Sequence, residues 1–285
     1  CVITGATAGI APSDKRLYGL RDVTATVESI PLITASIMSK KLAEGLDALV
    51  LDVKFGSGAF MKTREHAQTL AKSLVATGQR MNVKTSALLT DMNQPLGRMA
   101  GNVNEVQESI DTLRGEGPAD LTELTLELGA EILCLTQEDA NRNDKLASLQ
   151  KQIDSGNGYE KFKQMVAAQG GSLSELSPVA ASQEICATTG GHIQTINTGQ
   201  LGEAIIELGG GRKVMTDKID HSVGLEMLVR IGDRVDAGQP LVRLYAHESS
   251  VSQANSMVRD AVTIGDERPT EQELIVQRIT AENEE

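Results

Sequence analysis

The fold is decided by one stretch, DALVLDVKFGSGAFMKTREHAQTLAKSLVATGQRMNVKTSALLTD, residues 47–91. The run at 47–54 is short and almost continuously apolar, which is typical of a strand buried on both faces of a sheet, and residues 84–91 are predicted as a second buried strand. Between them, residues 63–80 have the pattern of an amphipathic helix, with Thr63 as its N-cap. A strand, a helix and a second strand in this order predict a βαβ unit and a mostly parallel sheet.

Further helices are predicted on both sides of this unit. They cover 31–41, 102–115 and, with a break near 155–158, residues 120–168. Pro31 favours a helix start, and Gly45 and Gly115 can each end a helix. The polar, glycine-containing loop at 169–178 is the predicted domain boundary.

Beyond that loop the pattern changes to short apolar strands separated by Gly, Asp and Pro, which favours a small β-rich module. The predicted strands are GGHIQTI (190–196), GEAIIEL (202–208), SVGLEMLVRIGDRV (222–235) and QPLVRLYAHE (239–248). The acidic end, residues 267–285, is interpreted as a solvated helix or strand.

Composition excludes several classes of protein. The net charge of −12 argues against nucleic-acid binding but allows a small anionic substrate in a locally basic pocket. No apolar run reaches the ~18 residues that a membrane span needs, and no signal peptide is recognised. The cysteines, Cys1, Cys134 and Cys186, are odd in number and lack a CxxC pair, so we expect no disulfide framework and a cytoplasmic location.

The predicted helix at 31–41 carries an unexpected polar pair. Ser36 and Lys40 are spaced i, i+4 and share a face with Ile33 and Ile37. The lysine either extends to solvent at the helix C-terminus, where the dipole favours a cation, or belongs to a polar cluster in an apolar pocket.

Other motifs allow a structural and a functional interpretation. KFGSGAFMKT (54–63) approaches a P-loop, but Met61 stands where the second glycine is needed, so the stretch is interpreted either as a turn that lines a ligand cleft or as a turn that only leads into the next helix. Asp91 and Asn93 follow a predicted strand and suit either a cleft or an Asx turn. The four histidines lack metal-ligand spacing. The C-terminal turns resemble biotinyl and lipoyl carrier domains but lack the carrier lysine.

Several blocks carry a family resemblance: residues 11–63, LLTDMNQPLG (88–97), GNVNEV (101–106), GPADLTEL (117–124), MVAAQGG (165–171), GGGR (209–212) and IDHSVG (219–224). In this order they resemble the pyrimidine nucleoside phosphorylases and thymidine phosphorylases. The chain starts with CVIT, well inside the family's pattern. We therefore expect a preceding N-terminal part that holds the phosphate loop, and we expect the 285 residues alone to be inactive.

The resemblance implies a substrate site for the pyrimidine ring. It assigns base recognition to Arg21, Ser36 and Lys40, a further site position to Tyr18, and apolar contact with the base to Val27 and Ile33. Donors and cations aimed at the ring would stabilise the negative charge that develops on the leaving base. Ala6 departs from the family, which more often has an amide side chain there.

The resemblance also implies a potassium site, to which Leu96, Met99 and Glu108 would contribute, and no organic cofactor. The implied activity is reversible phosphorolysis of thymidine, with uridine left open, to the free base and (2-deoxy)ribose 1-phosphate. Phosphate is the co-substrate, the implied role is nucleoside salvage, and the implied assembly is a homodimer that binds neither nucleic acid nor membrane.

The implied fold class is α/β: a mostly parallel sheet domain, part of a helical domain and a C-terminal β-rich barrel-sandwich (α+β) module. We place the end of an α/β segment at 1–12, the helical part at 13–43, the α/β domain at 44–175 and the C-terminal module at 176–285.

The alternatives are a carrier-like binding module, a P-loop ATPase, an AMP phosphorylase and an anthranilate phosphoribosyltransferase. A biotin or lipoyl mass shift would favour the first, and nucleotide binding that depends on Lys62 would favour the second. The residues at Arg21, Ser36 and Lys40 argue against the last two.

Overall fold

The computed structural model describes residues 1–3, 11–14, 29–137, 140–214, 216–248 and 251–281. Its main helices are α2 (Ile30–Ala43), α3 (Arg64–Arg80), α4 (Val103–Leu113), α5 (Ala119–Thr136), α6 (Arg142–Asp154), α7 (Asn157–Ala168), α8 (Thr198–Glu207) and α9 (Val251–Asp260). Its strands are β1 (Ala48–Phe55), β2 (Lys84–Asp91), β3 (Met99–Gly101), β4 (Ser182–Cys186), β5 (Gly191–Ile196), β6 (Gly224–Met227), β7 (Arg234–Val235), β8 (Pro240–Tyr245), β9 (Val262–Gly265) and β10 (Ile275–Ile279).

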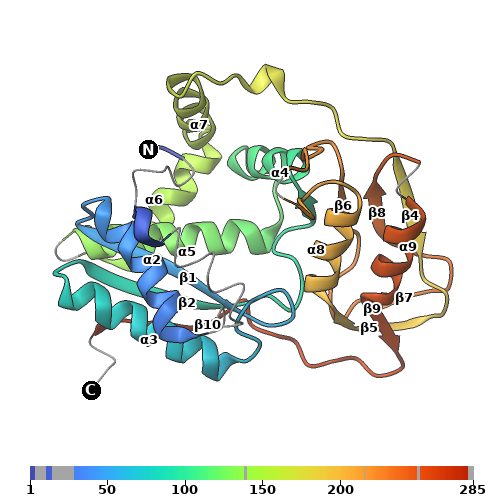
Figure 1. Cartoon of the computed structure of the whole chain (residues 1–285), viewed down its shortest axis with the longest axis horizontal. Coiled ribbons are helices and arrows are strands. Elements are labelled where there is room, and N and C mark those ends of the chain that lie inside the picture. Colours follow the sequence, from blue (N-terminus) through green and yellow to red (C-terminus); the bar gives the residue numbers. More distant parts are fainter. Residues whose placement is uncertain (4–10, 15–28, 138–139, 215, 249–250, 282–285) are drawn as a thin grey trace.

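The first sheet has the strand order β1-β2-β10, and it confirms the predicted βαβ unit. β1 and β2 are parallel, with Ala48 paired to Lys84 at one end and Phe55 to Asp91 at the other. Every residue of β2 after Lys84 is buried, because β2 lies between two strands while α3 covers one face of the sheet and α5 the other (Figure 1). A strand enclosed in this way must be almost wholly apolar or internally hydrogen-bonded.

The helix α3 packs on this sheet through one continuous stripe. Thr63 caps it by accepting a hydrogen bond from the backbone N–H of His66, as predicted. Its buried residues are Ala67, Leu70, Ala71, Leu74, Val75 and Gly78. Gly78 is the point of closest approach to the sheet, since a Cβ added there would lie 2.0 Å from Thr85 Oγ1.

We expect Gly78→Ala to lower the free energy of unfolding by about 1–3 kcal/mol, because the added methyl group overpacks a buried contact. Alanine in a helix ordinarily gains about 1 kcal/mol over glycine, so the sign of the effect is diagnostic. Urea unfolding measures it. Gly202→Ala in α8 is the matched control, since a Cβ there meets nothing within 4 Å. Equal stabilisation by both substitutions would contradict this account of the packing.

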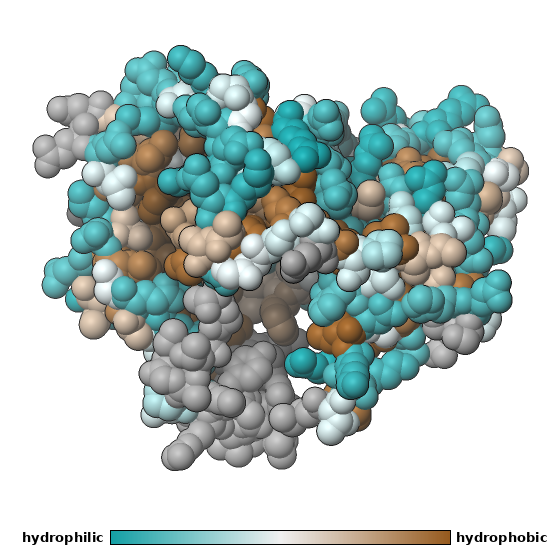
Figure 2. Space-filling model, turned by 90° about the horizontal axis from the view of Figure 1, so that it is seen from above, coloured by the Kyte–Doolittle hydropathy of each residue, from teal (hydrophilic) through white to brown (hydrophobic). Residues whose placement is uncertain are grey.

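Two further sheets have the orders β3-β6-β8-β4 and β7-β5-β9, and all of their strands except β3 lie in the C-terminal module, between residues 182 and 265. Their apolar residues form one buried cluster together with α8 and α9. Hydrophilic residues cover most of this module on the face shown at the right of Figure 2. No sheet among the described residues closes into a barrel, so the barrel-sandwich architecture stays a prediction.

One predicted strand is wrong. Residues 202–208 lie in and just beyond α8 rather than in a strand. The Asn197 side chain caps α8 by accepting a hydrogen bond from the backbone N–H of Gln200, and Leu201, Ala204 and Leu208 are buried. This spacing of three and four residues is that of a helix face, and the isoleucine pair at its centre concealed it.

Two strands, β10 and β3, pair with a sheet that is formed mainly by the other half of the chain. The acidic end contributes β10, which pairs antiparallel with β2, so the chain returns to the first sheet after completing the C-terminal module. In the opposite direction, β3 leaves the first half of the chain and pairs with β6. The predicted helical stretch at 120–168 is divided into α5, α6 and α7. Among the described helices, none is long and apolar enough to cross a membrane.

Candidate functional site

A cavity of about 460 Å³ lies between α2, the carboxyl end of β1 and the glycine-rich loop that follows β1. α2 starts at Ile30 with Pro31 in its first turn, as predicted, and Gly45 follows its end with φ +70°. The helix α2 packs against α3. Its polar residues Ser36 and Lys40 therefore lie at the edge of the hydrophobic core of the first sheet rather than on an open surface.

Ser36 and Lys40 both line this cavity, together with Ile33 and Ile37. Ser36 is buried, and its Oγ accepts a hydrogen bond from Lys40 Nζ at 2.9 Å. Lys40 Nζ also lies 2.7 Å from Asp14 Oδ2, and its side chain is 30% exposed. Of the two interpretations left open by the sequence, the structure therefore supports a polar cluster in an otherwise apolar pocket.

A second polar group on the first sheet borders the same cavity, and the sequence did not identify it as a site. Lys54 Nζ lies 2.9 Å from Asp52 Oδ2 and donates to Thr90 Oγ1 at 3.2 Å. The Thr90 hydroxyl donates to Asp52 Oδ1 at 2.5 Å. The only sequence signal for this group was the spacing of Asp52 and Lys54, which places them on one face of a strand. Asp14 gave no signal, because it reaches Lys40 from 26 residues away.

The glycine-rich loop does not have the form of a P-loop. Met61 is buried in the core of the first sheet instead of leaving room for a phosphate. Ser57 fixes the loop to the C-terminal module by donating from Oγ to the Ile196 carbonyl at 2.9 Å and accepting from the Thr198 N–H at 3.1 Å. Phe60 lines the cavity while 68% exposed. The loop therefore contributes an apolar side to the cavity, and it also leads into α3, so both of its interpretations remain open.

Asp91 and Asn93 form the Asx turn that was one of their two predicted roles. Asp91 is buried, and its carboxylate accepts from Asn93 Nδ2 at 2.5 Å and from the Asn93 N–H at 3.3 Å. Burial raises the pKa of Asp91 above its usual value, although these hydrogen bonds oppose the shift. Asp91 also borders a separate cavity of about 350 Å³ beside the N-terminus of α5.

The residues predicted for a potassium site come together at a third place. The loop at residues 94–99 follows β2, and Glu108 on α4 points at it; we call it the cation loop after the potassium site predicted there. Glu108 Oε1 accepts the N–H groups of Arg98 at 2.8 Å and Met99 at 3.2 Å. Burial raises the pKa of Glu108, while these backbone hydrogen bonds lower it.

The atoms that this loop and Glu108 could offer to a cation are oxygens. Glu108 is 7% exposed and forms no direct salt bridge with any described residue, although the positive charge of Arg230 acts on its carboxylate from a longer distance. Gly97 leaves open the space beside it, since a Cβ there would lie 2.4 Å from Glu108 Oε2. Carboxylate and carbonyl oxygens are hard ligands. In the part of the chain that the structure describes, no three His, Cys, Asp or Glu side chains lie close enough together to hold a metal ion.

The remaining predicted site positions, Tyr18, Arg21, Val27 and the departure at Ala6, lie outside the described residues. The structure thus brings Ile33, Ser36 and Lys40 together at the cavity. The roles assigned to all these residues in binding a substrate stay predictions.

Comparison with known proteins agrees with the resemblance. A family described as "Glycosyl transferase family, a/b domain" matches residues 1–159, more than half of the chain. A second, "Pyrimidine nucleoside phosphorylase C-terminal domain", matches residues 192–265.

Individual relatives are similar over most of the chain. A pyrimidine-nucleoside phosphorylase of Bacillus subtilis (strain 168) is 44% identical over 271 residues, which cover 93% of this chain and 63% of that protein. One of Staphylococcus aureus (strain bovine RF122 / ET3-1) is 44% identical over 270 residues, covering 93% and 62%. The matched region thus spans less than two thirds of the length of these relatives. The chain belongs to the glycosyl transferase family with this α/β domain, and it is similar to the pyrimidine-nucleoside phosphorylases over most of its length.

Proposed function

We propose that the intact gene product carrying this chain catalyses the reversible phosphorolysis of pyrimidine nucleosides to the free base and a pentose 1-phosphate. One observation carries the proposal: the Ser36–Lys40 pair faces a cavity of suitable size whose other lining is largely apolar. The relatives named pyrimidine-nucleoside phosphorylase support the same reaction.

The pair suits the departure of a base. A phosphate oxygen forms a bond to the anomeric carbon while the bond from that carbon to the ring nitrogen breaks, and its electron pair moves into the pyrimidine. The Lys40 ammonium and the Ser36 hydroxyl can donate to a ring carbonyl as that charge develops. Ile33 and Ile37 exclude water from the same wall, which strengthens the electrostatic effect of the ammonium.

Several parts of the proposal extend beyond this geometry. We include thymidine as a substrate, a role in nucleoside salvage, a homodimer, a potassium ion at the cation loop, and no organic cofactor. Cys1, Cys134 and Cys186 are free thiols, which supports a cytoplasmic location.

A UV assay of the intact gene product with thymidine and with uridine, each with and without phosphate, tests the reaction. We expect base release that requires phosphate, and the ratio of kcat/KM for the two nucleosides gives the sugar specificity. Release at equal rates without phosphate would indicate a hydrolase. No release from either nucleoside would reject the proposed function.

A further inference from the structure

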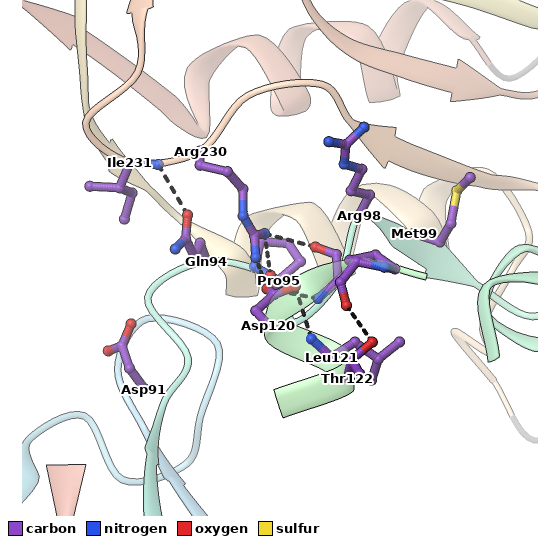
Figure 3. Close-up of polar contacts among 12 residues, drawn as sticks. Asp91, Gln94, Pro95, Arg98, Met99, Asp120, Leu121, Thr122, Arg230 and Ile231 are labelled. Atoms are coloured by element: carbon purple, nitrogen blue, oxygen red, sulfur yellow. Dashed lines mark hydrogen bonds and ion pairs between the residues drawn. The ribbon is translucent and has the colours of Figure 1, made fainter. Parts of the chain in front are cut away.

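The cation loop is held by an arginine that comes from the C-terminal module. Arg230 Nη1 donates to the carbonyl oxygens of Pro95 and Gly97, both at 2.7 Å. Figure 3 shows Arg230 beside Pro95 and Asp120. Arg230 Nη2 forms an ion pair with Asp120 at the start of α5. The Asp120 carboxylate in turn accepts the N–H of Gly97 at 3.1 Å. One guanidinium therefore joins three elements that are far apart in the sequence.

Neighbouring contacts fix the same loop to the same segment of the module. Gln94 Oε1 accepts the N–H of Ile231 at 3.0 Å, and the carbonyl oxygen of Arg98 accepts the N–H of Met227 at 2.7 Å (Figure 3 shows the first of these). The loop is thus attached at its start, its middle and its end. Asp120 offsets part of the positive charge that Arg230 brings beside the loop.

These contacts determine which backbone carbonyl groups of the cation loop have no hydrogen-bond donor and so could bind a cation. The carbonyls of Pro95, Gly97 and Arg98 each accept a hydrogen bond from the module. The carbonyl of Leu96 lies between two that Arg230 binds, and no described residue donates to it.

The carbonyl of Met99 has no hydrogen bond to β6 for a different reason. Bonded and non-bonded pairs alternate along an antiparallel ladder, and Arg98 is bonded to Met227. The next pair, Met99 with Glu226, is therefore non-bonded, and its backbone groups point away from β6. The Met99 N–H accordingly donates to Glu108.

We propose that Arg230 is a positioning residue for a monovalent-cation site made by the Leu96 and Met99 carbonyls and the Glu108 carboxylate. By binding the carbonyls on either side of Leu96, it holds the loop so that these oxygens can converge. The C-terminal module would thereby control cation affinity without touching the ion. The inference rests on the potassium ion included in the proposed function.

The test uses Arg230→Met in the intact gene product, because methionine keeps much of the apolar stem and removes every donor. Two quantities are measured in K⁺ and in Na⁺ at equal ionic strength: the melting temperature and the K⁺ concentration for half-maximal phosphorolysis. The melting temperature reports binding without catalysis, since an ion that binds only the folded state stabilises it. Arg243→Met is the matched control, because it removes ion pairs with Glu184 and Glu226 in the same module.

We expect Arg230→Met to raise the half-saturating K⁺ concentration about 10-fold or more, which is the typical effect of removing a residue that orients the ligands of a metal ion. The K⁺-specific rise in melting temperature should shrink with it, whereas Arg243→Met should retain both responses. If Arg230→Met does not fold, Arg230→Lys is the second variant, because lysine keeps the positive charge but lacks the planar guanidinium that can bind two carbonyls at once. It should raise the half-saturating K⁺ concentration by a smaller factor.

The contrary outcomes are distinct. A melting temperature that falls equally in both salts, with the K⁺ response intact, would give Arg230 a merely structural role and overturn the inference. Phosphorolysis without any K⁺ response in the parent protein would overturn it too, while leaving the phosphorylase proposal in place. If K⁺ but not Na⁺ raises the melting temperature of a protein that releases no base, the proposed function is rejected, while the inference of a cation site at the cation loop still stands.

Discussion

Glu131→Ala is expected to lower the free energy of unfolding by about 3 kcal/mol, the low end of the range for breaking a buried ion pair. Glu131 on α5 is 0% exposed. Its carboxylate lies 2.7 Å from Arg142 Nη1, and both of its oxygens accept from Arg278 Nε at 2.8 Å. The low end applies because both arginines are partly exposed and can be hydrated once the carboxylate is gone.

The pH dependence of this effect has a definite sign. Burial alone would raise the pKa of Glu131, but hydrogen bonds and charge from Arg278 and Arg142 outweigh it and hold the pKa below its usual value of 4.5. A carboxylate whose pKa is lowered on folding stabilises the protein above its unfolded pKa, and the stabilisation is lost as the pH falls through the folded pKa. The gap in stability between the parent and Glu131→Gln should therefore be constant near neutral pH and narrow below about pH 4.5.

Urea unfolding at several pH values measures both effects. Glu160→Ala, which removes an exposed pair with Lys163 on α7, is the control and should cost less than about 1 kcal/mol. Similar losses from Glu131→Ala and Glu160→Ala would show that the buried network contributes no more than a surface pair. A gap that widens in acid would contradict the assigned direction of the pKa shift.

This network also shows which features of the fold the sequence could predict. β1, α3 and β2 were predicted almost to the residue, because their apolar pattern and the Thr63 cap are local signals. That β10 would pair with β2 was not predictable, since the partner of an edge strand depends on the whole topology. Arg278 reaches Glu131 only because of that pairing. The helix α8 was missed because its two adjacent isoleucines resemble a strand run.

In the candidate site, too, the features set by local sequence could be predicted, and those set by tertiary contacts could not. Ser36 and Lys40 could be paired from sequence because i, i+4 neighbours on one helix must meet. Their contact with Asp14, and the contact of the cation loop with Arg230, depend on chain segments that only the folded structure brings together. Local spacing therefore predicted the residues on single elements, and tertiary structure added those that position them.

In the intact gene product, Lys40→Met is expected to lower kcat/KM for the proposed phosphorolysis by about 10²–10³-fold, the usual effect of removing one donor from a developing anion. The Lys40 ammonium is held at the cavity by Ser36 and Asp14, so its position is set before a substrate arrives. If it acts on the leaving base, most of the loss should be in kcat, because the charge is present in the transition state and absent from the bound nucleoside.

The neighbouring Lys41 provides the control for this substitution. It lies on the same helix, is more exposed, and pairs with Glu44 at 3.0 Å away from the cavity lining. Lys41→Met removes the same charge from the same helix, so we expect it to change kcat/KM by less than about 3-fold, within the range of surface substitutions. Equal losses from both variants would point to the net charge of α2, and a rise in KM with unchanged kcat would make Lys40 a group that binds the ground state and the transition state alike.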